Sequence, residues 1–163
     1  MKLFETGIPD RELLEGLAPS PDRAKPLAVL ECFEKFPCDP CKAVCPTDAI
    51  VMDRITDIPR LIPEKCTGCA KCVVACPGLA IFMVWPKKNL VWVPHEFVPI
   101  PQRGEIVDAL DREGNVIAQA EVKAVMNARK KLETTVVCVQ VPRELLMEVR
   151  AIRVREKGDV REE

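Results

Sequence analysis

The feature that most constrains this chain is a pair of cysteine runs. Seven of its nine cysteines lie in these runs, three in the first and four in the second, and each run ends in Cys-Pro. Shifting the chain by 31 residues superimposes Cys38, Cys41 and Cys45 on Cys69, Cys72 and Cys76. A repeat whose copies each hold a cysteine loop, a short helical turn and an apolar strand cannot bury its own apolar face. The sequence therefore predicts two copies packed as a pseudo-twofold pair.

The second run has the spacing Cys-x2-Cys-x2-Cys-x3-Cys-Pro, from Cys66 to Pro77. It resembles the iron-sulfur run of bacterial two-cluster ferredoxins, in which three cysteines hold one cluster and the fourth ligates the other cluster. The resemblance implies electron transfer through two 4Fe-4S clusters with a crossed set of ligands. One cluster, called cluster one below, would take Cys32, Cys38, Cys41 and Cys76, and cluster two would take Cys66, Cys69, Cys72 and Cys45.

Cys32 is the least regular member of this set. The residue that aligns with Cys66 is Lys35, whose ammonium group cannot ligate iron, and Cys32 lies three residues before it. We expect the segment from Cys32 to the first run to loop out and still deliver a thiolate, with Phe33 and Phe36 covering the cluster from water. If Cys32 does not ligate, the alternative is a three-iron cluster.

Two other interpretations of the cysteines are less favourable. Tetrahedral zinc sites use pairs of cysteines separated by a longer spacer, whereas three thiols at two-residue intervals before Cys-Pro suit a cubane better. Disulfides between neighbouring Cys-x-x-Cys thiols would close small, strained loops, and the N-terminus does not resemble a secretory signal. We therefore expect a reducing, cytoplasmic setting.

Two further residues could carry chemistry. Cys138 lies in the β-branched segment from Thr134 to Val141, so we expect it to be a buried strand residue. His95 is the only histidine and has no carboxylate or cysteine motif around it, which favours a surface or packing role over proton transfer. No residue suggests an acid, a base or a nucleophile, so we expect no catalytic residue in this chain.

Composition narrows the possible partners. The formal net charge is -1, and acidic and basic residues are interspersed, which gives no general attraction for nucleic acid. The chain also lacks the strong acidity of a free carrier that is steered by charge, which favours a resident subunit. The longest apolar stretch, Leu79 to Trp85, is too short to span a bilayer, so we expect a soluble protein without a membrane span.

The sequence predicts an α+β chain in three parts. Fourteen of the fifteen prolines precede Gln102, after which β-branched and charged residues dominate, so a boundary is expected near Pro99 to Pro101. Residues 1–26 are expected to form an extended docking segment with a short helix, residues 27–101 a ferredoxin-like two-cluster domain and linker, and residues 102–163 a small antiparallel β-barrel or half-barrel.

The pattern also places the individual elements. In the first two parts we expect a helix at Asp10–Gly16, strands near Leu27–Leu30, Ile50–Met52, Leu61–Ile62 and Ala80–Val84, and helical turns after Cys41 and Cys72. In the third part we expect a hairpin of Glu105–Leu110 and Val116–Val125, a strand at Thr134–Val141, a short helix at Pro142–Val149 and a last strand at Ile152–Arg155, with Leu90–Val93 as a candidate further strand.

The wider layout is similar to that of a second family. The stretch from Leu27 through Cys32, Cys38 and Cys41 to Ile50, with a proline-rich lead-in and a β-rich tail, resembles ferredoxin-like small subunits of multi-subunit flavin-dependent dehydrogenases. Those enzymes act on proline, hydroxyproline, sarcosine or related amines and hydroxy compounds. The resemblance implies a hetero-oligomer with flavoprotein subunits that carry FAD or FMN. This chain would relay electrons between flavins or to an external acceptor, without a substrate site of its own.

Two alternative functions belong to other classes. The first is a free-standing, low-potential ferredoxin that serves several soluble enzymes. The second is a binding module that the clusters merely stabilise, in which the β-rich part would recognise the partner.

Overall fold

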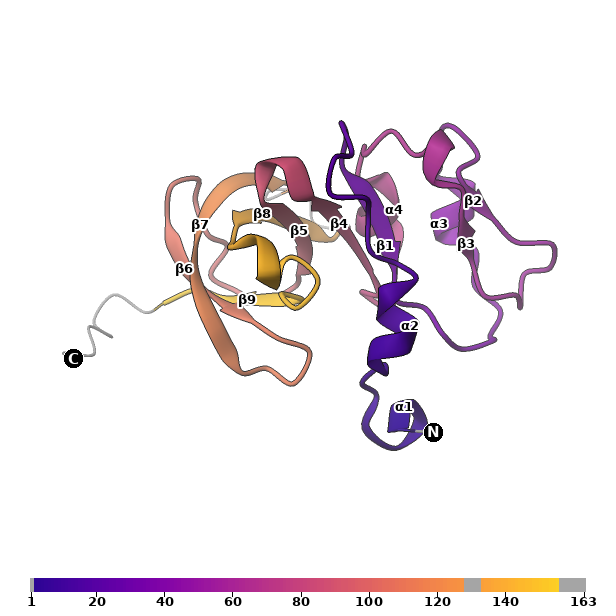
Figure 1. Cartoon of the computed structure of the whole chain (residues 1–163), viewed down its shortest axis with the longest axis horizontal. Helices are drawn as coiled ribbons and strands as arrows, with labels where there is room; N and C mark the ends of the chain where they lie inside the picture. The colour runs from indigo at the N-terminus through magenta and orange to yellow at the C-terminus, as the bar shows by residue number, and fades with distance from the viewer. Residues whose placement is uncertain (1, 128–132, 156–163) are drawn as a thin grey trace.

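A seven-stranded antiparallel sheet is the largest element of the structure (Figure 1). The computed structural model describes residues 2–127 and 133–155. From one edge to the other, the sheet holds β1 (Leu27–Leu30), β4 (Ile81–Trp85), β5 (Leu90–His95), β8 (Thr135–Gln140), β7 (Val116–Met126), β6 (Ile106–Leu110) and β9 (Ala151–Arg153). Strands that flank the cysteine runs and strands from the C-terminal part therefore share one sheet.

The cysteine runs lie at one end of this sheet, on the right in Figure 1. This end contains the helices α3 (Pro40–Ala43) and α4 (Lys71–Ala75), the 3-10 turn η1 (Pro63–Lys65), and a separate two-stranded ladder of β2 (Ile50–Val51) and β3 (Arg60–Leu61). Pro40 begins α3 at a position where its missing N–H is no loss. The two helices pack against each other, which brings the two cysteine runs together.

The repeat of the sequence is also a repeat of the backbone. The helices α3 and α4 begin 31 residues apart, and Asp48 and Leu79, also 31 apart, both have positive φ angles, of 50° and 53°. The Asp48 amide donates to the Cys45 carbonyl at 3.4 Å, and the Leu79 amide donates to the Cys76 carbonyl at 3.3 Å. Both Cys-Pro segments therefore make the same turn before the chain enters the strand that follows.

The sheet has a core on each face. On one face, valines such as Val91, Val122 and Val137 are fully buried in the larger core. On the other face, Val136 and Met83 pack with Val73 of α4 and with the buried cysteines. The β8 strand is therefore buried on both faces, as its run of β-branched residues indicates. The cysteine-containing end, which is too small to bury much apolar surface by itself, is completed by this sheet.

The predicted barrel or half-barrel for residues 102–163 is not a closed barrel. The sheet has two free edges, β1 and β9, although it curls enough to bring β9 against β5. The reason is the connection after β4: the 3-10 turn η2 (Pro86–Lys88) and Asn89, with a φ of 54°, reverse the chain into β5. Because β8 then pairs with β5, the C-terminal strands extend the existing sheet, which crosses the boundary expected near Pro101.

The remaining elements are short. The predicted N-terminal helix is present as α2 (Arg11–Glu15), and α1 (Lys2–Thr6) precedes it without having been predicted. Both project from the body in Figure 1, and α2 has no buried residue. The helix expected at Pro142–Val149 is only a 3-10 turn, η3 (Arg143–Leu145). Among residues 2–127 and 133–155, no helix is long and apolar enough to cross a bilayer.

Candidate iron-sulfur site

The structure gathers eight cysteines around two separate cavities. The first cavity is lined by the four thiols that the crossed ligand pattern assigns to cluster one: Cys32, Cys38, Cys41 and Cys76. The second is lined by the four thiols assigned to cluster two: Cys45, Cys66, Cys69 and Cys72. The irregular Cys32 thus lies at the same cavity as Cys38 and Cys41, although the spacing of the first run does not include it.

The crossing between the halves follows from the two helices. Cys41 lies within α3 and lines the first cavity, whereas Cys45 lies two residues after the end of α3 and lines the second. Cys72 and Cys76 are divided in the same way at α4. Each helix therefore separates its run between two sites, and the packed helix pair joins the cavities.

The two crossing cysteines accept matched hydrogen bonds. The Ala49 amide donates to Cys45 Sγ at 3.2 Å, and the Ala80 amide, 31 residues further on, donates to Cys76 Sγ at 3.4 Å. Hydrogen bonds to ligand sulfur withdraw charge from an iron-sulfur centre and are one determinant of its reduction potential. The donors are backbone amides, so no side chain in the sequence could have predicted these hydrogen bonds.

Burial opposes ionisation of the central thiols. It raises the pKa of Cys41 to about 11 and that of Cys72 to about 12, and nearby cysteines add to both shifts. Burial opposes ionisation of Cys45 too, but backbone amides of Thr47 and Ala49 donate to its sulfur, and the pKa of Cys45 is lowered. Since metal ligation requires thiolates, cluster assembly must release protons from the buried pair.

An arginine and a glycine shape the loop that carries Cys66. Arg23 Nη2 donates to the carbonyl oxygens of Pro63 at 2.8 Å and Cys66 at 3.0 Å. Gly68 has a φ of +75°, and a Cβ added there would lie 2.9 Å from the carbonyl oxygen of Pro26. The proline-rich segment before β1, which supplies Arg23 and Pro26, therefore holds this loop in place.

The donor sets suit a multi-atom cluster. Each cavity is surrounded by four sulfur donors, and all nine cysteines are free thiols. A zinc ion instead needs its ligands gathered about one point, at about 2.0–2.3 Å from the metal. In the described ranges, no three His, Cys, Asp or Glu side chains are close enough together to hold a single metal ion. The arrangement thus favours the iron-sulfur interpretation over the zinc one.

The other residues singled out from the sequence have mixed outcomes. Phe36 lines the first cavity but is 44% exposed, and Phe33 faces a neighbouring hollow, so the expected aromatic cover is incomplete. Cys138 is buried in β8, as predicted, and burial raises its pKa to about 12. His95 is buried in β5 with its Nε2 3.3 Å from the Pro99 carbonyl oxygen, which confirms the packing role.

Sequence reasoning missed a group of charged residues beside the first cavity. Glu31 directly precedes Cys32, and its carboxylate is held by Arg112 and Arg150 from the C-terminal part. Burial opposes ionisation of Glu31, but hydrogen bonds and charge from the two arginines lower its pKa. These partners are 81 and 119 residues away in sequence, and no motif connects them.

Comparison with known proteins agrees with this geometry. Residues 36–80 match the model of the 4Fe-4S dicluster domain family. The chain is 46% identical over 57 residues to one subunit of the Na(+)-translocating ferredoxin:NAD(+) oxidoreductase complex of Acetobacterium woodii, covering 35% of this chain and 17% of that protein. Over 39 residues it is 46% identical to the polyferredoxin-like subunit of aliphatic sulfonate oxidoreductase of Pyrococcus furiosus, covering 24% of this chain and 22% of that protein.

A third relative, Protein NrfC of Escherichia coli K12, is 45% identical over 42 residues, which cover 24% of this chain and 19% of that protein. The matched segment thus spans less than a quarter of each of these relatives. No solved structure matches the chain. Residues 36–80 are therefore an iron-sulfur electron-transfer domain of the dicluster ferredoxin type, homologous to subunits of oxidoreductase complexes, and the eight cysteines in residues 32–76 fit two 4Fe-4S clusters.

Proposed function

We propose that this protein is the electron-relay subunit of a flavin-dependent oxidoreductase complex, in a hetero-oligomer with FAD- or FMN-containing subunits. The observation that carries the proposal is the pair of adjoining four-cysteine cavities. Cys32, Cys38, Cys41 and Cys76 are the proposed ligands of cluster one, and Cys45, Cys66, Cys69 and Cys72 those of cluster two. Because α3 and α4 pack together, and each helix with the cysteine that follows it supplies ligands to both sites, the two clusters would be neighbours, as an electron relay requires.

Residues of this chain would position the cluster ligands and exclude water from around them. The 4Fe-4S clusters supply reversible one-electron transfer when bound. Ala49 and Ala80 donate hydrogen bonds to the crossing sulfurs, and Val73 of α4 and Ile81 of β4 are fully buried in the same core as Cys41 and Cys72. Cys69 at the second cavity is exposed, and Cys32, Cys38 and Cys76 at the first are half-buried, so each cavity has thiols near the surface where an electron can enter or leave.

Exposed apolar residues support a partner-bound state. Phe4 is 62% exposed on α1, and Phe97 and Val98 are 77% and 87% exposed in the connection after β5. The N-terminal segment projects from the body, as expected of a docking segment (Figure 1). The Acetobacterium and Pyrococcus relatives are named as subunits of larger oxidoreductases, which supports the same arrangement for this chain.

The kind of flavoprotein is a finer proposal. The layout resembles subunits of dehydrogenases that act on amines and hydroxy compounds. The three relatives are not of the proline, hydroxyproline or sarcosine type and give that specificity no support. We also place the protein in a reducing cytoplasm, where free thiols remain available for cluster assembly.

Anaerobic co-purification from the native host tests the proposal. We expect a stoichiometric flavoprotein to accompany the tagged chain, and the bound flavin to pass electrons to an external acceptor. A Cys72→Ser variant is the matched control: the flavin should still be reduced by its substrate, whereas electron transfer to the acceptor should fail. A redox-active monomer without flavin would instead support a free ferredoxin, and a complex without redox activity would support a binding module.

A further inference from the structure

A buried charged group lies where β1 ends and the ligand segment of cluster one begins. Glu31, Arg112 and Arg150, called the Glu31 clamp below, have side chains only 8%, 10% and 4% exposed. Together with Cys32 they line one hollow, which opens beside the first cysteine cavity. Ionised side chains are costly to bury, so such a group needs full pairing and calls for an explanation.

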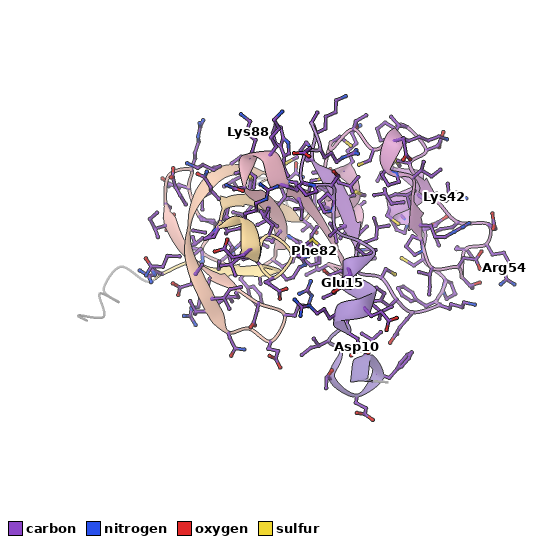
Figure 2. The ribbon with its side chains drawn as sticks, in the orientation of Figure 1. Asp10, Glu15, Lys42, Arg54, Phe82 and Lys88 are labelled. Atoms are coloured by element: carbon purple, nitrogen blue, oxygen red, sulfur yellow. The ribbon has the colours of Figure 1, made fainter. Side chains whose placement is uncertain are left out.

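The pairing is nearly complete. Arg112 donates hydrogen bonds to both carboxylate oxygens of Glu31, from Nε to Oε2 at 2.9 Å and from Nη2 to Oε1 at 2.6 Å. Arg150 Nε donates to Glu31 Oε1 at 2.7 Å, and its Nη1 donates to the carbonyl oxygens of Leu146 and Val149. The Arg150 guanidinium also lies 4.7 Å from the ring centroid of Phe82, which Figure 2 labels near the middle of the molecule. The Glu31 carboxylate is therefore fixed from two directions.

The backbone of Glu31 links Cys32 and Cys76, two of the proposed ligands of cluster one. Its amide donates to the Ala80 carbonyl at 2.8 Å, and the Ala80 amide donates to Cys76 Sγ at 3.4 Å. Cys32 is the next residue along the chain, and residues 31–37 contain no helix or strand. The cysteine spacing does not fix Cys32, so the position of its thiol depends on contacts of the neighbouring residues, of which Glu31 is the most firmly held.

The second half of the repeat has a different anchor. There, Arg23 donates to the Cys66 carbonyl oxygen itself, and no buried carboxylate takes part. The two first ligands are thus held by unrelated contacts, although the loops that follow them repeat. A change in the Glu31 clamp should therefore affect cluster one and leave cluster two intact.

We propose that the Glu31 clamp is a positioning device that holds Cys32 in the ligand set of cluster one. This inference rests on the proposed ligation by Cys32. The clamp residues line neither cysteine cavity. They act through the backbone of Cys32 and through the Ala80 amide that donates to Cys76 Sγ. The C-terminal part of the chain, which supplies both arginines, is then required to complete an iron-sulfur centre whose other three cysteines lie between residues 38 and 76.

The chain offers a matched control for the test. Asp108 is also a carboxylate that is 7% exposed and is held by two arginines, with Arg153 Nη2 and Arg155 Nε each at 2.8 Å. It belongs to β6, close to β9, and lines neither cysteine cavity. Asp108→Asn therefore removes a buried carboxylate from a pairing with two arginines without touching the cysteine segment, although these arginines are more exposed than Arg112 and Arg150.

The experiment compares Glu31→Gln, Arg112→Gln, Asp108→Asn and Cys32→Ala in the full chain, purified anaerobically and then oxidised with ferricyanide. A four-iron cluster with a loosely held corner loses one Fe2+ and gives one electron to ferricyanide, which leaves a three-iron cluster. That product is paramagnetic, so low-temperature paramagnetic resonance counts it. We expect a three-iron signal approaching one per chain and about seven irons instead of about eight in Glu31→Gln. Arg112→Gln should give a smaller three-iron fraction and Asp108→Asn none.

The outcomes separate the two proposals. Two intact four-iron clusters in both clamp variants would overturn the positioning role, as would equal damage in Glu31→Gln and Asp108→Asn. If Glu31→Gln does not fold, the Arg112→Gln variant decides between the outcomes. Arg112 belongs to the turn between β6 and β7, so it can be replaced without breaking a strand. If Cys32→Ala itself keeps both four-iron clusters, ligation by Cys32 fails, and the positioning role fails with it.

Discussion

Replacement of Gly68 by alanine should damage the loop of cluster two for two separable reasons. Gly68 has a φ of +75°, and this left-handed conformation costs an L-residue about 1–2 kcal/mol. The new Cβ would also lie 2.9 Å from both Cδ and the carbonyl oxygen of Pro26. Because one of these atoms belongs to the backbone, the contact forces a shift, and such overpacking costs about 1–3 kcal/mol.

Gly104 provides the control for strain alone. Its φ is +87°, but nothing lies within 4 Å of the position of an added Cβ. Gly104→Ala should therefore lose only about 1–2 kcal/mol, whereas Gly68→Ala should lose about 2–5 kcal/mol in total. The difference corresponds to a factor of about 5 to about 150 in the population of the opened loop, at about 1.4 kcal/mol per tenfold change.

The assay has two readouts on anaerobically purified protein: the guanidinium midpoint of unfolding and the rate at which a chelator removes iron. Gly104→Ala should lower the midpoint slightly and release iron at the wild-type rate. Gly68→Ala should lower the midpoint further and release iron faster, with cluster two lost first. A Gly68→Asn variant keeps the Cβ contact but tolerates the left-handed conformation better. If Asn restores wild-type behaviour completely, or if the two alanine variants behave alike, contact with Pro26 is not the cause.

Cluster content, assembly and acid stability give three more predictions. Anaerobic analysis should find about eight irons and about eight sulfides per chain, a content that Cys138→Ser should not change; values near four would contradict two four-iron clusters. The chain expressed alone should aggregate or lose its clusters more readily than the complex, because binding to the folded form stabilises it; an air-stable monomer would contradict this. Burial opposes ionisation of Asp108, but Arg153 and Arg155 lower its pKa below the ordinary value of 3.8, so its stabilisation is complete above that pH and lost as the pH falls through the lowered pKa. Acid titration of unfolding should show this loss in the wild type and not in Asp108→Asn.

Local patterns account for what could be predicted. The spacing of the cysteines in the two runs placed seven thiols around two cavities, because ligand position follows from loop length and the helical turn after each run. Period-two alternation and the β-branched runs placed β7 and β8 within a residue or two of their observed ends. Both signals are carried by neighbouring residues, so a single sequence contains them.

The pairing of strands distant in sequence could not be predicted in the same way. The choice between a separate barrel and one continuous sheet depends on whether β8 pairs with β5, and no residue of either strand specifies its neighbour. The helix expected after Pro142 ends early because the chain must turn back, with the Arg150 amide donating to the Leu110 carbonyl as β9 joins β6. In both places, tertiary contacts override the local pattern.

Single charged residues were the hardest to place, and they make the two halves different. Arg23 from the N-terminal segment holds the carbonyl of Cys66, whereas Arg112 and Arg150 from the C-terminal part hold Glu31 next to Cys32. The repeat supplies the same loop twice, but the anchors come from opposite ends of the chain. The loop of each proposed cluster is therefore anchored by a different part of the chain, so a substitution in one anchor should disturb the cluster beside it before the other.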